Sequence, residues 1–179
     1  PAMAGEWKWE SGSSLVFTAK TVFPMGEKYQ IKLDAEKLVA PQIKLNTPQL
    51  EFTTTPFTLN LSKAEFYQDP RNPQQKSAIF TAKFNAPVDV LSFEKLITMS
   101  LLPNQPLKYS ILYNDKKTEA WIHSQPLALP DNPAQIKLSV GKGVKTVASA
   151  NQLQTVSDKL VNVPGLYSLE VNDVSAILA

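Results

Sequence analysis

KYSILYNDKKTEAWIHS, residues 108–124, decides the type of secondary structure that this chain forms. On both sides of a polar centre at residues 114–117, apolar side chains alternate with polar ones, and a period of two is the side-chain period of a β-strand. The apolar residues that then face one way are Ile111, Tyr113, Ala120 and Ile122. This pattern predicts a β-hairpin with one buried face.

The same alternation recurs along the chain. Residues 6–17 predict a second hairpin, with Trp7 and Trp9 on one face of its first arm. Further strands are predicted at residues 29–33, 49–55, 58–68, 77–88, 136–140 and 163–178. Proline occurs 14 times and glycine only 6 times, and the prolines interrupt every long helical pattern. The chain is therefore expected to be all-β.

One short helix is predicted at residues 89–97. Asp89 or Ser92 has a side chain that can cap its first turn. The apolar face of this helix consists of Phe93, Leu96 and Ile97. Short strands at close spacing, separated by turns, predict β-sandwiches with this helix as an insertion.

Composition excludes several functions. The chain has 179 residues, 43% hydrophobic and 19% charged, which suits one or two folded domains. Its 18 basic and 16 acidic residues are scattered, so no basic cluster favours nucleic acid. The absence of cysteine excludes disulfides, thiolate metal sites and a cysteine-based thioester within these residues. Residues 1–20 lack the apolar core of a signal peptide, so we expect the targeting segment to lie upstream or to have been removed.

Residues that could carry enzyme chemistry are scarce. His123, the only histidine, lies in or beside a predicted strand, and no GxSxG segment supplies a serine nucleophile. A solvated histidine at a strand end is the favoured interpretation. Gly141-Lys142-Gly143 lacks the spacing of a phosphate-binding loop and is interpreted as a turn. No catalytic, cofactor-binding or metal-binding residue is predicted, and the chain is not expected to be an enzyme.

Isolated aspartates raise the possibility of calcium bound between consecutive sandwiches. They are Asp69, Asp89, Asp131 and Asp173. Calcium needs several oxygen ligands that converge, often from carboxylates two residues apart, and no DxD pattern occurs. These aspartates are therefore interpreted as turn formers.

The three tryptophans allow a binding function. Trp7, Trp9 and Trp121 could form a stacking platform for carbohydrate. Large rings two residues apart on a strand more often pack in a core, because they bury most area there. Core packing is the favoured interpretation.

Two blocks of residues carry a resemblance to a known family. The first consists of Gly5, Glu6, Trp7, Lys8, Trp9, Leu15, Val16, Phe17, Phe23, Pro24, Gly26 and Tyr29. The second consists of Thr53, Thr54, Pro56, Phe57, residues 65–70 (EFYQDP), Phe84, Pro87, Val88, Phe93, Glu94 and Lys95. The blocks cover residues 1–97 in order, and together they resemble the N-terminal modules of bacterial α2-macroglobulins, with Ala19 where a proline is usual in that family. The resemblance fades after Leu101, so the last third is placed by its order in the chain.

The resemblance implies two consecutive Ig-like, macroglobulin-type β-sandwich modules. Residues 1–56 are expected to be the C-terminal part of a first module that is incomplete at its N-terminus. Residues 57–164 are expected to form a second module that contains the short helix, and residues 165–179 a strand leading into the next module. An Ig-like sandwich needs about seven strands and roughly 100 residues, which only the second module has.

The resemblance also implies a function. Proteins of this family are periplasmic, often lipid-anchored to the inner membrane, and trap proteases by a conformational change after bait cleavage. Since no bait or thioester residue maps onto this chain, it is expected to be a scaffold with no cofactor. Its expected partners are neighbouring modules and, through the parent protein, target proteases, with membrane contact only through an upstream anchor. The alternative is an Ig-like adhesin or carbohydrate-binding array.

Overall fold

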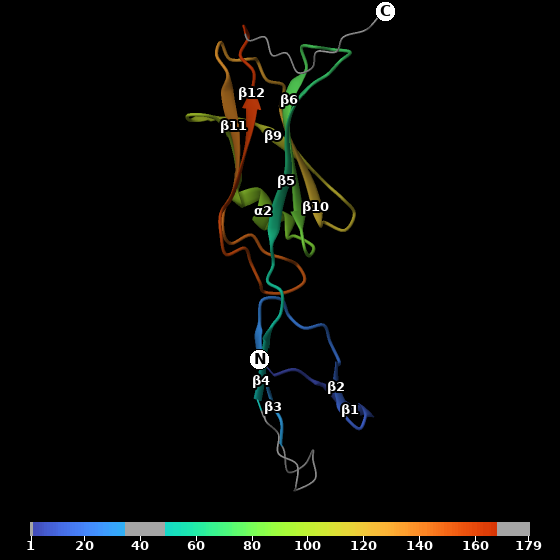
Figure 1. Cartoon of the computed structure of the whole chain (residues 1–179). Coiled ribbons are helices and arrows are strands. Elements are labelled where there is room, and N and C mark those ends of the chain that lie inside the picture. The colour runs from blue at the N-terminus through green and yellow to red at the C-terminus, as the bar shows by residue number, and fades with distance from the viewer. Residues whose placement is uncertain (1, 35–48, 168–179) are drawn as a thin grey trace, which may run out of the picture.

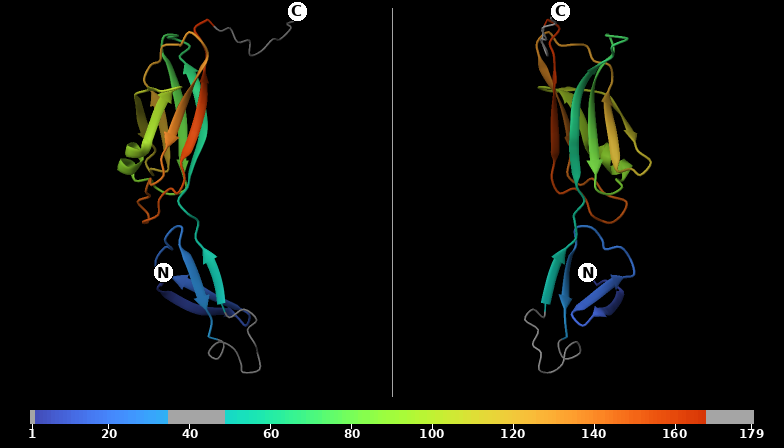
Figure 2. Two further views of the ribbon diagram at one scale, coloured as in Figure 1. Left: turned by 90° about the vertical axis from the view of Figure 1, so that its left-hand side faces the viewer. Right: turned by 45° about the vertical axis from the view of Figure 1, so that its right-hand side comes forward.

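The computed structural model describes residues 2–34 and 49–167, in two groups of antiparallel strands (Figure 1). Residues 59–163 form two four-stranded sheets that pack face to face. Residues 5–53 contribute two two-stranded sheets at the other end of the molecule (Figure 2). The predicted all-β class is confirmed.

The larger group has the strand order of an Ig-like sandwich. Its first sheet, in spatial order, consists of β5 (Leu59–Gln68), β6 (Lys76–Phe84), β10 (Glu119–Ser124) and β9 (Tyr109–Tyr113). Its second sheet consists of β12 (Ser157–Val163), β11 (Ala134–Val140), β7 (Ile97–Leu101) and β8 (Gln105–Pro106). When the strands are lettered A to G in chain order, with β8 as an extra C′ strand, the sheets read ABED and GFCC′. This is the division of strands between the two sheets of an Ig domain, with C′ added at one edge.

Alternation along the strands creates the core between the sheets. The predicted hairpin is present as β9 and β10, and its register places Ile111 opposite Ile122 and Tyr113 opposite Ala120. The largest side chains with less than 2% exposure are Phe80, Phe93, Ile122, Ile136, Leu138, Val88, Val140, Val144 and Val163. They come from both sheets and from the connecting segments, so a single apolar layer holds the sandwich together.

The predicted helix is present as α2 (Val90–Leu96). Asp89 caps it, because its carboxylate accepts a hydrogen bond of 2.8 Å from the Ser92 amide. Phe93 is fully buried and packs edge-on against Phe84, with ring centroids 5.2 Å apart. The helix ends at Leu96, because Ile97 is already extended and begins β7. Among the described residues, no helix is both long and apolar enough to cross a membrane.

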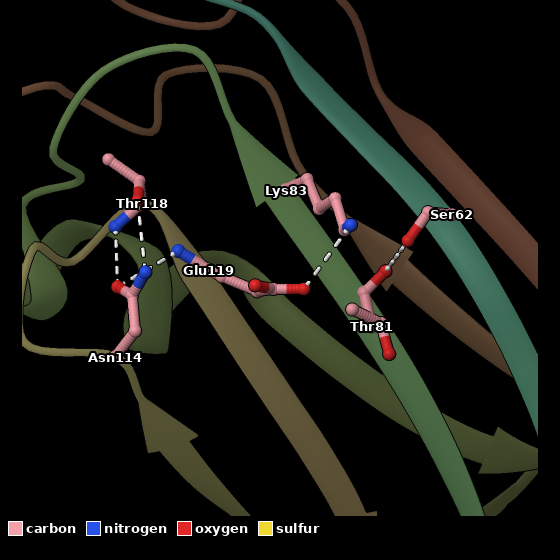
Figure 3. Close-up of polar contacts among 6 residues, drawn as sticks. All are labelled: Ser62, Thr81, Lys83, Asn114, Thr118 and Glu119. Carbon is pink, nitrogen blue, oxygen red and sulfur yellow. Dashed lines mark hydrogen bonds and ion pairs between the residues drawn. The ribbon is translucent and has the colours of Figure 1, made fainter.

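The turn between β9 and β10 is held by one side chain (Figure 3). The Asn114 side-chain oxygen accepts hydrogen bonds from the amides of Thr118 at 2.9 Å and Glu119 at 3.2 Å. Lys117 takes the left-handed conformation, with φ of 54°, that lets the chain reverse here. Beside the turn, Glu119 forms an ion pair with Lys83 of β6 at 3.5 Å. Asn114 therefore stabilises the turn by its hydrogen bonds, while Lys117 takes the backbone conformation that glycine often supplies in hairpin turns.

The smaller group contains two separate strand pairs. These are β1 (Gly5–Ser11) with β2 (Ser14–Ala19), and β3 (Lys28–Lys32) with β4 (Gln49–Thr53). The first pair is the predicted hairpin of residues 6–17, with Trp7 opposite Phe17. In the second pair Tyr29 lies opposite Phe52.

Not every strand was predicted. Strands β7 and β12 have no counterpart among the predictions, although both belong to the core. The strand predicted at residues 163–178 is wrong over residues 164–167, which follow β12 without strand structure, and the remainder lies outside the described residues. Pro164 and Gly165 at the end of β12 explain this correction, because neither residue favours continuation of a strand.

The helix offers a matched test of the core. We expect Phe93→Ala to lower the free energy of unfolding by about 3–5 kcal/mol, because it leaves a cavity among Phe84 and its neighbours. Leu91→Ala, on the same helix but 69% exposed, should change it by less than about 0.5 kcal/mol. Urea denaturation of the two variants measures the difference. Equal losses in both would contradict the assigned burial.

Candidate functional site

His123 does not form a catalytic pair. It lies in β10, opposite Ile79 on one side and Ser110 on the other, and is half-buried. The neighbouring Ser124 points to the opposite face of the sheet, because successive strand residues alternate. The Ser124 hydroxyl accepts a bond of 2.9 Å from the Ala78 amide and donates one of 2.9 Å to the Gln125 carbonyl. This hydroxyl has a structural role. Ser110 lies opposite His123, but in the described residues no hydrogen bond joins the two side chains.

The Gly141-Lys142-Gly143 segment is a turn, as predicted. Gly143 has a φ of 96°, a conformation that glycine adopts readily. Its amide donates to the Leu153 carbonyl at 2.8 Å, and the Gly141 amide donates to the Leu96 carbonyl at 2.8 Å. Both glycine amides are therefore engaged within the protein and are not free to bind a phosphate.

The predicted turn-forming aspartates occupy turns or caps. Asp69 accepts a hydrogen bond of 2.8 Å from the amide of Arg71, which closes an Asx turn. Asp89 caps α2, Asp131 is exposed in a loop, and Asp173 lies outside the described residues. Within residues 2–34 and 49–167, no three acidic, histidine or cysteine side chains come together as a metal site would require.

The core interpretation of Trp7 and Trp9 is wrong for the described chain, because their side chains are 48% and 46% exposed. Trp121, on the outer face of β10, is half-buried. Trp7 instead begins a row of aromatic rings along the smaller group of strands. Neighbouring centroids lie 4.9 to 6.4 Å apart in the succession Trp7, Phe17, Phe23, Tyr29 and Phe52. Sequence alternation placed Trp7 and Trp9 on one face of the strand, but it could not show that this face is exposed in the described structure.

A hollow of about 260 Å³ lies beside this aromatic row. Rings of the aromatic row border it together with Gln30 and Lys32, so both apolar and polar groups line it. Tyr29 is 5% exposed, and within the described part of the chain its hydroxyl has no hydrogen-bond partner. A buried polar atom without a partner costs about 1–3 kcal/mol. Because this hydroxyl is enclosed, it is not available to a ligand at the surface of the hollow.

Two exposed ion pairs lie across neighbouring strands. Lys28 and Glu51 approach to 2.6 Å between β3 and β4, and Lys137 and Asp158 to 2.6 Å between β11 and β12. The hydrogen bond from Lys28 holds the pKa of Glu51 below its usual value. The hydrogen bonds from Lys137 and then Ser139 do the same for the pKa of Asp158. These pairs support strand register and have no catalytic geometry.

Residues 54–58 connect the two groups of strands (Figure 2). Hydrogen bonds of Thr54 fix the first end of this connector. The Thr54 hydroxyl donates to the Pro24 carbonyl at 2.7 Å and accepts from the Glu27 amide at 2.9 Å. The Thr54 amide donates to the Glu27 carbonyl at 2.9 Å. The connector thus begins as an integral part of the smaller group.

Asn85 holds the other end of the connector. Its side-chain nitrogen donates to the Pro56 carbonyl at 2.8 Å, and its side-chain oxygen accepts from the Thr58 amide at 2.9 Å. Asn85 directly follows β6, so the sandwich itself carries these bonds. Because both ends are bound, the connector is the place where the two groups of strands are held relative to one another.

Comparisons with known proteins identify the family. The chain is 50% identical over 183 residues to an alpha-2-macroglobulin homolog of Yersinia pestis, a match that covers 99% of this chain and 9% of that protein. It is 34% identical over 184 residues to the alpha-2-macroglobulin of Pasteurella multocida, which covers 95% of this chain and 10% of that protein. The chain belongs to the bacterial α2-macroglobulin family. It spans about a tenth of the length of the curated relatives it matches.

The resemblance to α2-macroglobulins therefore runs beyond Leu101, where the sequence motifs stop, and through nearly the whole chain. No family model matches. This chain also aligns with a crystal structure of native alpha-2-macroglobulin from Escherichia coli that spans domains MG0-NIE-MG1. The alignment covers 60% of this chain and 32% of that chain, with a TM-score of 0.42 and 16% identity. At this TM-score the family assignment rests on the sequence comparisons.

The Asp158 pair in this α2-macroglobulin segment predicts a pH dependence. The folded state holds the pKa of Asp158 below its ordinary value of 3.8. Ionised Asp158 therefore stabilises the folded state above the pKa that it has in the unfolded chain. This contribution is lost as the pH falls through the pKa that Asp158 has in the folded state. Because the carboxylate is 42% exposed, we expect Asp158→Asn to lower the free energy of unfolding by less than about 1 kcal/mol at neutral pH. The variant should also lose less of this free energy than the unchanged chain as the pH falls.

Urea denaturation between neutral pH and acid measures this effect. Gln135→Ala, which removes the uncharged hydrogen bond of 3.0 Å to Asn162 on the same sheet face, is the matched control and should leave the acid slope unchanged. A slope that stays the same in Asp158→Asn would show that this pair makes no contribution.

Proposed function

We propose that this chain is a structural scaffold of a periplasmic α2-macroglobulin-like inhibitor that traps proteases by conformational change. The observation that carries the proposal is the 50% identity to a bacterial α2-macroglobulin homolog over 99% of the chain. The absence of cysteine means that a Cys-Gln thioester cannot lie within these residues. The bait region and any thioester then belong to other parts of the parent protein, and this chain acts without an enzymatic step.

The sandwich has the mechanical properties that a scaffold needs. Its interior is an unbroken apolar layer, and close-packed interiors have low compressibility and transmit displacement. Its outer strand positions carry polar side chains and ion pairs such as Lys137 with Asp158. A module of this kind passes a movement of one neighbour to the next as a rigid body.

We further propose that residues 57–164 are one whole module, that residues 1–56 are the C-terminal part of the preceding module, and that residues 165–179 lead into the next. Residues 59–163 contain both four-stranded sheets and almost all of the core. The smaller group has two strands in each sheet, and isolated two-stranded sheets are marginally stable in water.

Neighbouring parts of the parent protein are the partners that the aromatic row supports. The half-exposed rings of Trp7 and Trp9 present an apolar surface that a neighbouring part could cover. Target proteases would be met through the parent protein, and membrane attachment would come from an upstream lipid anchor. Exposure of Trp7 and Trp9 also favours the carbohydrate-binding alternative, which glycan binding by the isolated chain would test.

Protease trapping provides the decisive test. We expect the isolated chain, mixed with trypsin-like, elastase-like and subtilisin-like enzymes, to leave their activity on large protein substrates unchanged. The full-length parent protein should reduce that activity under the same conditions. Stoichiometric loss of activity with the isolated chain, or no loss with the parent, would overturn the proposal.

Autonomous folding tests the division into modules. We expect residues 57–167 to give dispersed amide resonances and one cooperative unfolding transition, because they contain both sheets of the sandwich. Residues 1–56 alone should give neither as a monomer, since Trp7, Trp9 and Phe52 would remain largely uncovered. A dispersed spectrum and a sharp transition for monomeric residues 1–56 would contradict the proposed division.

A further inference from the structure

The loop between β11 and β12, residues 141–156, reaches the connector and is itself firmly held. The Thr146 hydroxyl donates to the Pro87 carbonyl at 2.7 Å, and Thr146 is only 4% exposed. The Val147 amide donates to the same carbonyl at 3.0 Å. The side chains near the tip of this loop are therefore presented from a fixed position on the sandwich.

Asn151 lies at that tip and bonds to the connector. Its side-chain oxygen accepts a hydrogen bond of 2.7 Å from the amide of Phe57, a residue that is 2% exposed. The Asn151 backbone is anchored as well, because its carbonyl accepts from the Thr146 amide at 3.3 Å. Loss of the side-chain bond would leave the Phe57 amide without this partner in a buried place, which makes the bond costly to break.

The other side of the Asn151 side chain faces the smaller group of strands at Gly26. A Cβ atom on Gly26 would lie 2.2 Å from the side-chain nitrogen of Asn151, so only glycine allows this approach. Gly26 also has a φ of 68°, in the left-handed region. Its amide donates to the Thr55 carbonyl at 3.1 Å, which ties this turn to the connector. Asn151 is thus wedged between the connector and the turn that the smaller group presents.

Apolar packing fills this junction only in part. Met25 packs against the edge of the sandwich core. Beside it, a cleft of about 550 Å³ separates residues 22–25 from residues 148–150. An open cleft on one side means that apolar packing does not fill the junction, so its polar contacts carry the orientation.

We propose that Asn151 is a positioning residue that locks the angle between the smaller strand group and the sandwich, with Gly26 as its complementary surface. The connector then behaves as a stiff joint while Asn151 is seated and as a hinge when it is displaced. This inference rests on the proposed scaffold function for its purpose, because a scaffold transmits movement only through a joint of defined angle. Its geometry can be tested without any protease.

A distance across the joint tests the lock. Because the chain has no cysteine, Ser13→Cys and Lys116→Cys place one spin label in the exposed turn of each part. Double electron–electron resonance should give a narrow distance distribution for the labelled chain without further substitutions. Asn151→Ala should broaden or shift it, and the Phe57 amide should exchange with solvent about tenfold faster. Asn151→Asp, which keeps the accepting oxygen, should restore both readouts.

Two further variants separate a lock from a general loss of structure. Gly26→Ala disturbs the contact between Gly26 and Asn151 from the side of the smaller group. It should change the distance distribution without changing the melting temperature of the sandwich. Asn60→Ala, at an exposed position on β5, is the matched control and should change neither readout. A wild-type distance distribution in both Asn151→Ala and Gly26→Ala would overturn the lock. That result would leave the scaffold proposal standing, because protease trapping by the parent protein tests the scaffold separately.

Discussion

The apolar layer between the two four-stranded sheets is the interaction on which the rest of this structure depends. Phe80 and Ile122 from one sheet and Ile136 and Leu138 from the other are completely buried. Each such side chain contributes about 1.5–3 kcal/mol relative to exposure, which is large against the 5–15 kcal/mol by which domains are stable. The helix, the long loops and the connector are all anchored to this layer, so their positions follow from it.

The smaller strand group is organised differently. Its rings pack in a row, and Tyr29 alone among them is buried, while Trp7 and Phe52 remain 48% and 39% exposed. Its ion pair between Lys28 and Glu51 lies in solvent, where such pairs contribute little. Its place relative to the sandwich therefore depends on the hydrogen bonds around the connector, and a few polar contacts can be exchanged more easily than an apolar core.

This contrast suits a segment of an α2-macroglobulin. The trap that we propose for the parent protein needs bodies that stay folded and joints that have defined positions. The Ig-like sandwich supplies the body, because Phe93 and Ile122 are completely buried in its core. The connector supplies the joint, where Thr54, Asn85 and Asn151 each bind backbone groups that would otherwise be free to rotate.

The sequence by itself determined the local structure and the family. A period of two along residues 108–124 is a property of neighbouring residues, and the hairpin that it predicted is present. The helix cap is local as well: the sequence offered Asp89 or Ser92, and the structure uses Asp89. The tertiary structure decided the ABED and GFCC′ order of the strands, the exposure of Trp7 and Trp9, and the contact of Asn151 with Phe57, 94 residues away. Strand β12 was missed, because its place in the core depends on pairing with β11. Local patterns specify which face of a strand is apolar, but only long-range packing decides what covers that face.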